Sequence, residues 1–348
     1  MLFKIRKNIE RELCACIRNI DKSYSLSKIS PFLFQNIKSF VFRKGKRVRP
    51  ILFIMGYLGF AKKSTSGLYA SAASFELLHD FLLVHDDIID KSDTRRGKPS
   101  MHKMLNNYLA KYNKGIKFNG QDLAIVVGDV MYATAIHAFL SINEDMVRKE
   151  KALRNFIKAA IFTGGGEFIE LLYGIKDIAK ITKQDIYKIY DYKTAHYTFS
   201  APLCSGAILA GASQAEIQRL TQYGIYLGRA FQIKDDVLGM FADEDKIGKS
   251  TLTDLQESKK TLLIWYTYHH SSGNNKRIIK SIFAKEIVHK TDLSKIRKII
   301  ILCGALDFVK KELFSLRKKA QGLLKSSLMK TKYKAFLAQY SQEILDFE

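Results

Sequence analysis

The chain has 348 residues, with 57 Lys and Arg against 34 Asp and Glu, so its formal net charge is +23, and 47% of its residues are hydrophobic. This apolar fraction excludes a disordered basic tail protein, because it is enough to build a folded core. Only 4 residues are proline, far below the usual share of about 5%, and this deficit favours long helices. No CxxC pair occurs among the 4 cysteines, Cys14, Cys16, Cys204 and Cys303, so we expect no zinc site and a reducing, cytoplasmic compartment.

The positive charge is concentrated at the two ends of the chain. Residues 1–50 and 276–348 each carry a net charge of +10, whereas the residues between them carry only +3. No zinc-finger, RNP or basic-zipper pattern accompanies this charge. We therefore predict no nucleic-acid partner.

Apolar residues recur at helical spacing along almost the whole chain. The first residues carry charges every few positions, so neither a secretory signal nor a membrane anchor is expected. In chain order, polar or Gly-containing breaks are predicted at 43–50, 62–67, 91–100, 111–120, 174–182, 242–253 and 271–275. The segments between them fit long helices, and alternating strand patterns are scarce. We predict an all-α protein whose 348 residues form a single domain.

The segment 123–140 is the most apolar long stretch. It contains Asp129 and His137, which favours a buried helix of a soluble domain over a membrane span. We therefore expect no transmembrane segment.

The predicted helix from about Gly67 to Asp90 ends in a cluster of carboxylates. Asp86 and Asp90 are four residues apart and share a helix face, with Asp87 beside them. Three carboxylates at a helix C-terminus repel one another and the helix dipole. Divalent cations explain this arrangement, because hard oxygen ligands can hold Mg²⁺ that also bridges phosphate oxygens. A short acidic string on a solvated helix end is the alternative for this motif taken alone.

A second acidic pair strengthens the metal hypothesis. Asp235 and Asp236 end another apolar segment, and two such clusters could face each other across a helical bundle. Cationic residues accompany both clusters, namely those in GKRVRP at 45–50 and RRG at 95–97, with Lys193, Lys249 and Lys259. This combination suits an anionic substrate that brings its own metal.

Seven motifs together resemble the trans-isoprenyl diphosphate synthases, also called polyprenyl synthetases. From about residue 45 to 260 they read GKRVRP, ELLHDFLLVHDDIID, DTRRGKP, GDVMYATA, GGGEFIEL, YKTAHYTFSAP and FQIKDDVLG, in the order and approximate spacing of that family. The resemblance implies a bundle of long, mostly antiparallel helices around a central cleft, with basic helical flanks at 1–44 and 276–348. It also implies a prenyltransferase that condenses isopentenyl diphosphate with allylic diphosphates.

Matched motif positions imply roles for individual residues. The resemblance assigns Mg²⁺, three ions per active site, to Asp86, Asp87, Asp90, Asp235 and Asp236. It assigns the allylic diphosphate to Arg95, Lys193, Thr194, Gln232, Lys249 and Lys259. It assigns isopentenyl diphosphate to Lys46, Arg49, His79 and Arg96. His85 and the glycines at 164–166 are interpreted as structural, the glycines as a site of close helix packing.

The chain departs from the family pattern at three positions. Gly239 stands where the second aspartate motif usually has its third carboxylate, and Asp243 lies too far along to replace it without a bend. Glu167 and Glu170 stand where the family usually has Gln and Asp. These departures bear on the affinity of the second metal site more than on the reaction.

Product length is predicted from the residues one turn before Asp86. Phe81 and Leu82 lie five and four residues upstream, where the prenyl tail would run. In the family, one aromatic residue five positions upstream accompanies many twenty-carbon products. We therefore expect geranylgeranyl diphosphate, with farnesyl diphosphate as the alternative.

Two other classes of function are kept beside the enzyme. A non-catalytic subunit of a heteromeric synthase usually loses an acidic motif, and a terpene cyclase would lack GKRVRP and RRG. By analogy with the family we expect a homodimer. The basic ends could concentrate diphosphate substrates or favour peripheral contact with an acidic membrane surface.

Overall fold

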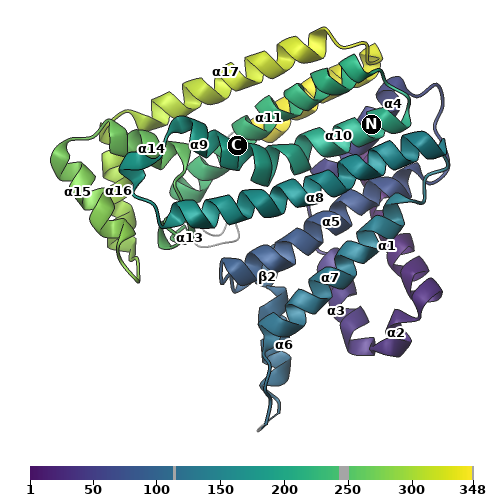
Figure 1. Ribbon diagram of the computed structural model, residues 1–348, viewed down its shortest axis with the longest axis horizontal. Coiled ribbons are helices and arrows are strands. Elements are labelled where there is room, and N and C mark those ends of the chain that lie inside the picture. Colours follow the sequence, from purple (N-terminus) through teal and green to yellow (C-terminus); the bar gives the residue numbers. More distant parts are fainter. Residues whose placement is uncertain (113–114, 243–250, 347–348) are drawn as a thin grey trace. The chain divides into compact units, whose positions relative to one another are not determined.

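The protein is almost entirely helical throughout the residues that the computed structural model describes, 1–112, 115–242 and 251–346 (Figure 1). In these ranges the only strands are β1 (Thr94–Arg95) and β2 (Lys98–Pro99), which pair antiparallel. Arg96 and Gly97 between them both have positive φ angles, as a tight two-residue hairpin turn requires. The predicted all-α class is confirmed.

Two compact units can be distinguished along the chain, and each is described by itself. The first comprises Met1–Arg154 and Ser205–Gly211, and the second comprises Asn155–Cys204 and Ala212–Glu348. Two compact units are compatible with one folding domain or with two. The single domain therefore stays a prediction.

The first unit is built around one apolar helix, α5 (Leu68–Ile89). Helix α5 packs against α1, α4 and α7, and it runs beside α7 in Figure 1. Nearly every side chain from Leu68 to Leu78 is buried, whereas the last turns are partly exposed. The first half of α5 therefore lies in the core of this unit, whereas its acidic C-terminal end is partly exposed. The helices of this unit are α1 (Leu2–Tyr24), α2 (Leu26–Ile29), α3 (Pro31–Val41), α4 (Val48–Phe60), α5, α6 (Met101–Leu109), α7 (Gly120–Phe139) and the start of α8 (Met146–Gly174).

Helix α7 begins with a capping box. The Asn119 side chain accepts hydrogen bonds from the Gln121 and Asp122 amides, and the Asp122 carboxylate accepts one from the Asn119 amide. By length and composition, α7 is the one helix in the described ranges that could cross a membrane. Its buried face packs against α5 and α6, as the core helix of a globular unit does.

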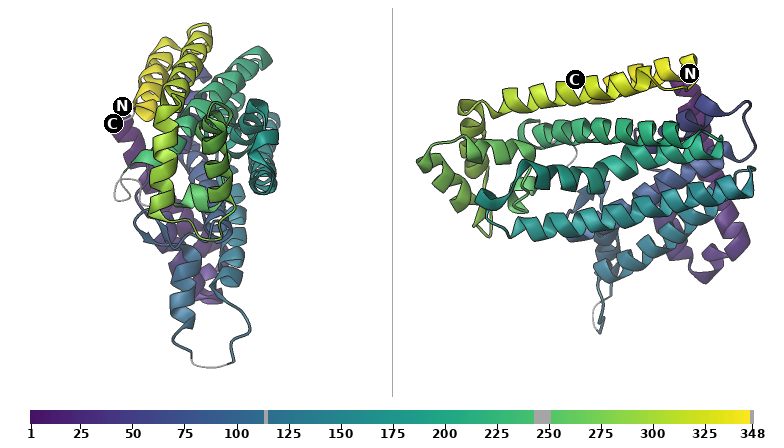
Figure 2. Two further views of the ribbon diagram at one scale, coloured as in Figure 1. Left: turned by 90° about the vertical axis from the view of Figure 1, so that its left-hand side faces the viewer. Right: turned by 45° about the horizontal axis from the view of Figure 1, so that its top comes forward.

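The second unit contains a long helix, α11 (Gln214–Phe241), that packs against η2 and α17. Helices α11 and α17 run side by side in both views of Figure 2. The segment η2 is a π-helix, a wider form of helix that is frequent at functional sites. Besides α11 and the end of α8, this unit contains η1 (Ile178–Lys180), α9 (Lys183–Ile189), η2 (Tyr190–Ser200), α13 (Thr253–Gln256), α14 (Leu262–His269), α15 (Gly273–Phe283), α16 (Lys290–Leu302), α17 (Ala305–Lys325) and α18 (Thr331–Leu345). Helix α10 (Ala201–Leu209) begins in this unit, and its residues from Ser205 on belong to the first unit.

Candidate active site

The first aspartate motif lies at the C-terminal end of α5. Asp86 and Asp90 are partly exposed, whereas the Asp87 side chain is completely buried. Arg95, from the hairpin that follows, donates from Nε to Asp87 Oδ1 at 2.7 Å and from Nη2 to Asp86 Oδ2 at 3.0 Å. The hairpin thus places one guanidinium against two of the three carboxylates.

These carboxylates have the properties that a divalent cation requires. The Oδ2 atom of Asp87 is buried, and no described residue gives it a hydrogen bond. Burial is the main cause that raises the pKa of Asp87 to about 6; Arg95 opposes this rise, and the neighbouring Asp86 and Asp90 contribute to it. A cation would relieve this repulsion, and hard oxygen donors are what Mg²⁺ prefers. The residues present therefore fit a divalent metal ion.

The three cations of the GKRVRP motif, at the start of α4, differ in burial. Lys46 is exposed and Arg49 is half-buried, but Arg47 between them is buried. Arg47 donates to Glu10 Oε1 at 2.7 Å, to Glu76 Oε1 at 2.6 Å and to the Arg43 carbonyl at 2.9 Å. Arg47 therefore anchors the motif, whereas the Lys46 side chain is exposed.

Cations surround His79 in the first unit. Burial lowers the pKa of His79 well below its ordinary value, and the nearby charges of Arg49, Arg96, Arg95 and Arg47 lower it further. His79 is therefore a neutral imidazole at pH 7, able to donate or accept a hydrogen bond without adding charge.

In the second unit, Lys193 lies between two glutamates of α8. Its Nζ atom is 2.6 Å from Glu167 Oε2, and it also donates to Glu170. Two of the three departures from the family pattern, Glu167 and Glu170, are thus the direct partners of this lysine. Gly166 permits this contact, because an added Cβ would lie 2.5 Å from the Lys193 backbone nitrogen. Close packing at this glycine is confirmed, whereas a Cβ at Gly164 or Gly165 would meet no described atom within 4 Å.

A chain of hydrogen bonds joins η2 to α11. Thr194 Oγ1 donates to Gln232 Oε1 at 2.6 Å, and Gln232 Nε2 donates to Asp236 Oδ1 at 2.9 Å. The Tyr190 hydroxyl donates to the other Asp236 oxygen and accepts from the Leu262 amide at 2.8 Å. Asp236 is therefore buried with a bond to each oxygen, and burial raises its pKa well above the ordinary value. This arrangement suits an orienting residue rather than an open metal ligand.

Asp235 is exposed, next to the buried Asp236. Four residues further on, a Cβ at Gly239 would lie 2.8 Å from Asp254 Oδ2. The Asp254 carboxylate of α13 thus lies next to Gly239, the position where the family motif usually has its third carboxylate. Lys259 pairs with Glu257 at 2.7 Å. Lys249 and Asp243 lie outside the described residues.

The proposed length-determining residues Phe81 and Leu82 lie on α5, and Phe81 contacts α7. The Phe81 ring packs against Tyr132 of α7, with a centroid distance of 5.0 Å, and against His85 at 4.8 Å. Leu82 is partly exposed. His85 Nε2 lies 3.3 Å from the Ile125 carbonyl oxygen, in agreement with the structural role expected for it.

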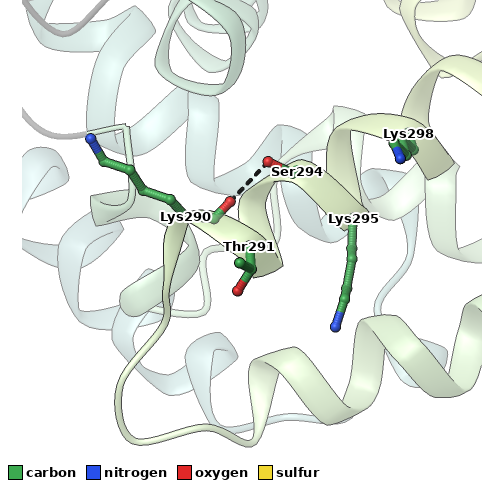
Figure 3. A pocket seen from close by; sticks show the side chains of 5 residues that line it. All are labelled: Lys290, Thr291, Ser294, Lys295 and Lys298. Atoms are coloured by element: carbon green, nitrogen blue, oxygen red, sulfur yellow. Dashed lines mark hydrogen bonds between the residues drawn. The ribbon is translucent and has the colours of Figure 1, made fainter.

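A surface pocket on the C-terminal basic flank contains none of the motif residues. It has a volume of about 330 Å³ and is lined by Lys290, Thr291, Ser294, Lys295 and Lys298 of α16 (Figure 3). The Ser294 hydroxyl donates to the Lys290 carbonyl at 3.0 Å. The pocket shows that part of the terminal charge is displayed on one exposed helix face.

An all-helical chain with aspartate clusters near helix ends and an arginine beside the first of them is consistent with the isoprenoid synthase fold and with the use of divalent metal ions. Residues 30–300 match the polyprenyl synthetase family model. The chain belongs to the polyprenyl synthetase family and is a prenyltransferase.

Relatives and solved structures agree with this membership. The chain is 32% identical over 295 residues to a geranylgeranyl diphosphate synthase of Sulfolobus acidocaldarius, covering 84% of each chain. It is 28% identical over 312 residues to a short chain isoprenyl diphosphate synthase of Methanocaldococcus jannaschii, covering 89% of this chain and 86% of the relative. A crystal structure of geranylgeranyl pyrophosphate synthase from Corynebacterium glutamicum, complexed with isoprenyl diphosphate and magnesium, shares the fold with a TM-score of 0.91. That structure is 24% identical and covers all of both chains.

Several residues around the site were not anticipated from the sequence. The carboxylates Glu76 and Asp80 bind the arginines of the first unit, Tyr190 binds Asp236, and Tyr132 packs on Phe81. Of these, only Glu76 and Asp80 could have been recognised from the sequence, because two acidic residues four apart on a strongly apolar helix face need partners.

Proposed function

We propose that this prenyltransferase condenses isopentenyl diphosphate with allylic diphosphates in a Mg²⁺-dependent reaction and releases geranylgeranyl diphosphate. The observation that carries the proposal is the complete first aspartate motif with Arg95 held against Asp86 and Asp87. The names of the Sulfolobus acidocaldarius and Methanocaldococcus jannaschii relatives support the substrate class.

Residues of the first unit would bind isopentenyl diphosphate. In the proposal, Lys46, Arg49 and Arg96 bind its diphosphate by charge-assisted hydrogen bonds, and neutral His79 adds a hydrogen bond. Guanidinium groups suit this task because they can donate two parallel bonds to phosphate oxygens. The alkene of this substrate then attacks the allylic carbon.

Ionisation of the allylic diphosphate is the step that needs the most stabilisation of charge. When bound, Mg²⁺, which we expect as three ions, would neutralise charge developing on the departing diphosphate. Asp86, Asp87, Asp90 and Asp235 would supply the oxygen ligands, and Asp236 would orient Gln232 and Thr194. Arg95, Lys193, Lys249 and Lys259 would donate hydrogen bonds to the leaving group. The C–O bond to the diphosphate breaks, a new C–C bond forms, and the released diphosphate takes the proton that is lost.

We also propose that the enzyme acts as a homodimer. Helix α8 exposes large apolar side chains at intervals that fall on one face, namely Ile161, Phe168 and Leu172. An exposed apolar stripe of this kind is typical of a surface that a protein partner covers. Sedimentation of the purified protein at micromolar concentration should give twice the chain mass, and Phe168→Asp should shift it toward the monomer. A monomeric wild-type protein would contradict this assignment.

A condensation assay tests the proposed reaction directly. Purified protein is incubated with labelled isopentenyl diphosphate and starters of five, ten or fifteen carbons, with and without Mg²⁺. We expect Mg²⁺-dependent formation of a twenty-carbon diphosphate. Chains that end at fifteen carbons would favour the farnesyl alternative. Inactivity alone that is reversed by a second synthase chain would favour the non-catalytic subunit.

A further inference from the structure

Two buried carboxylates on α5 contact an arginine that the proposed function assigns to isopentenyl diphosphate. Glu76 and Asp80 are one turn apart and their side chains are almost completely buried. Arg96 Nη2 is 3.1 Å from Glu76 Oε1, and Arg96 Nη1 is 3.2 Å from Asp80 Oδ1. These contacts join the middle of α5 to the turn of the β1–β2 hairpin.

The two carboxylates differ in what else they bind. Glu76 is shared with Arg47, at 2.6 Å, so it belongs to the anchor of the GKRVRP motif. Asp80 has an ion pair with Arg96 alone, and its two oxygens form no hydrogen bond within the described part of the chain. Arg96 Nη1 likewise forms none there. The pair is therefore close but poorly aligned.

Stability does not account for Asp80. A buried ion pair stabilises a fold only when good geometry and further hydrogen bonds offset the loss of water, and apolar replacements of such pairs are often neutral or stabilising. Burial, and then the neighbouring charge of Glu76, raise the pKa of Asp80, whereas the charges of Arg96, Arg47 and Arg49 oppose this rise. The carboxylate thus costs free energy where an apolar residue would pack well.

The backbone conformation of Arg96 helps to direct its side chain toward Glu76 and Asp80. Arg96 has a φ angle of +54°, in the left-handed region that a residue with a side chain rarely adopts. The preceding Arg95 is bound to Asp86 and Asp87 of the same helix. Since Glu76, Asp80 and Asp87 recur at intervals of four and seven residues, one face of α5 holds both arginines. The Arg95 guanidinium is thus bound to Asp86 and Asp87, and the Arg96 guanidinium is bound to Glu76 and Asp80.

We propose that Asp80 is a positioning residue for isopentenyl diphosphate: with Glu76 it holds the Arg96 guanidinium in its binding orientation and balances its charge until the diphosphate arrives. This inference rests on the proposed function, which assigns Arg96 to that substrate. The poor alignment of the pair follows from this role, because Arg96 must keep donors available for phosphate oxygens. Asp80 itself touches no reacting atom.

Three variants test the inference: Asp80→Asn, Asp80→Glu and, as a matched control, Asp93→Asn. Asp93 directly precedes the same hairpin and forms an exposed ion pair with Lys103 of α6. We expect Asp80→Asn to raise the KM for isopentenyl diphosphate about tenfold or more, as loss of a residue that orients a binding group does. The KM for the allylic substrate and kcat should change less than about threefold, and Asp80→Glu should restore part of the affinity.

Thermal unfolding and direct binding separate this role from a structural one. The Tm of Asp80→Asn should stay within about 3 °C of the wild type, because no hydrogen bond is lost and Arg96 keeps Glu76. Titration calorimetry with isopentenyl diphosphate should show the same loss of affinity without turnover. An unchanged affinity in Asp80→Asn, or an equal loss for both substrates, would overturn the inference.

Arg96→Ala distinguishes failure of this inference from failure of the proposed function. If Arg96→Ala weakens binding of isopentenyl diphosphate and Asp80→Asn does not, the positioning role alone is wrong. If Arg96→Ala has no effect on binding while the wild type still condenses the substrates, the assignment of Arg96 fails and this inference fails with it. If the wild type neither binds nor condenses isopentenyl diphosphate, the proposed function is wrong.

Discussion

Replacing Asp86 with Asn should lower kcat/KM for the allylic substrate by about 10²–10³, the effect seen when one preorganised group that stabilises transition-state charge is removed. Asn preserves the size of the side chain and can still accept the Arg95 hydrogen bond at Asp86 Oδ2. It lacks the negative charge that attracts a divalent cation. The loss should therefore appear in the metal requirement as well as in the rate.

Metal binding gives a readout that does not depend on turnover. Titration of the protein with Mn²⁺, followed by electron paramagnetic resonance, should show weaker binding or fewer bound ions in Asp86→Asn. Asp122→Asn is a suitable control, because Asp122 caps α7 by bonding to the Asn119 amide and lies outside the motif. Equal Mn²⁺ binding by Asp86→Asn and the wild type would remove this carboxylate from the metal site.

Replacing Asp235 or Asp236 with Asn should have different effects on metal binding and on stability. Asp235→Asn should reduce Mn²⁺ binding with little effect on Tm, because Asp235 is exposed. Asp236→Asn should mainly disturb the bonds to Gln232 and Tyr190 and so lower Tm. The reverse pattern would contradict the roles assigned to the two neighbours.

Replacing Phe81 with Ala should lengthen the product beyond twenty carbons. Removal of the ring opens space between α5 and α7, where the Phe81 and Tyr132 rings are in contact. Each added isoprene unit then gains apolar contacts in place of a steric clash. Mass spectrometry of the products, made from labelled isopentenyl diphosphate and a fifteen-carbon starter, measures the outcome.

Two further variants test whether a longer product is specific to the space beside Phe81. Leu83→Ala removes a partly exposed apolar side chain about 200° round α5 from Phe81 and should leave product length unchanged. Phe81→Ala combined with Tyr132→Ala should extend the chain further than Phe81→Ala alone, because Tyr132 packs on the other side of the same space. If Phe81→Ala still stops at twenty carbons, the limit lies elsewhere and Phe81 is not the length-determining residue.

Local sequence pattern predicted the helices and the main motif with good accuracy. The helix expected from about Gly67 to Asp90 is observed as Leu68–Ile89, because its signal is a long run of apolar residues with a polar break on either side. The break expected at 91–100 contains the β1–β2 hairpin, which is too short to leave a strand pattern. Turns such as the one between α16 and α17 were missed, since they interrupt apolar runs with only one glycine, Gly304.

The sequence by itself determined the all-α class, the family and the identity of the carboxylates and cations, because these depend on periodicity and on ordered motifs. Only the tertiary structure decided how neighbouring motif residues divide their roles. Asp235 and Asp236 are adjacent in sequence, yet one is exposed and the other is held by Tyr190 from η2. Sequence motifs assigned no role to Arg47 beside Lys46 and Arg49, and only the structure shows that Arg47 is buried against Glu10 and Glu76. Burial and pairing depend on residues distant in sequence, and no local pattern encodes which of two like charges will meet its partner.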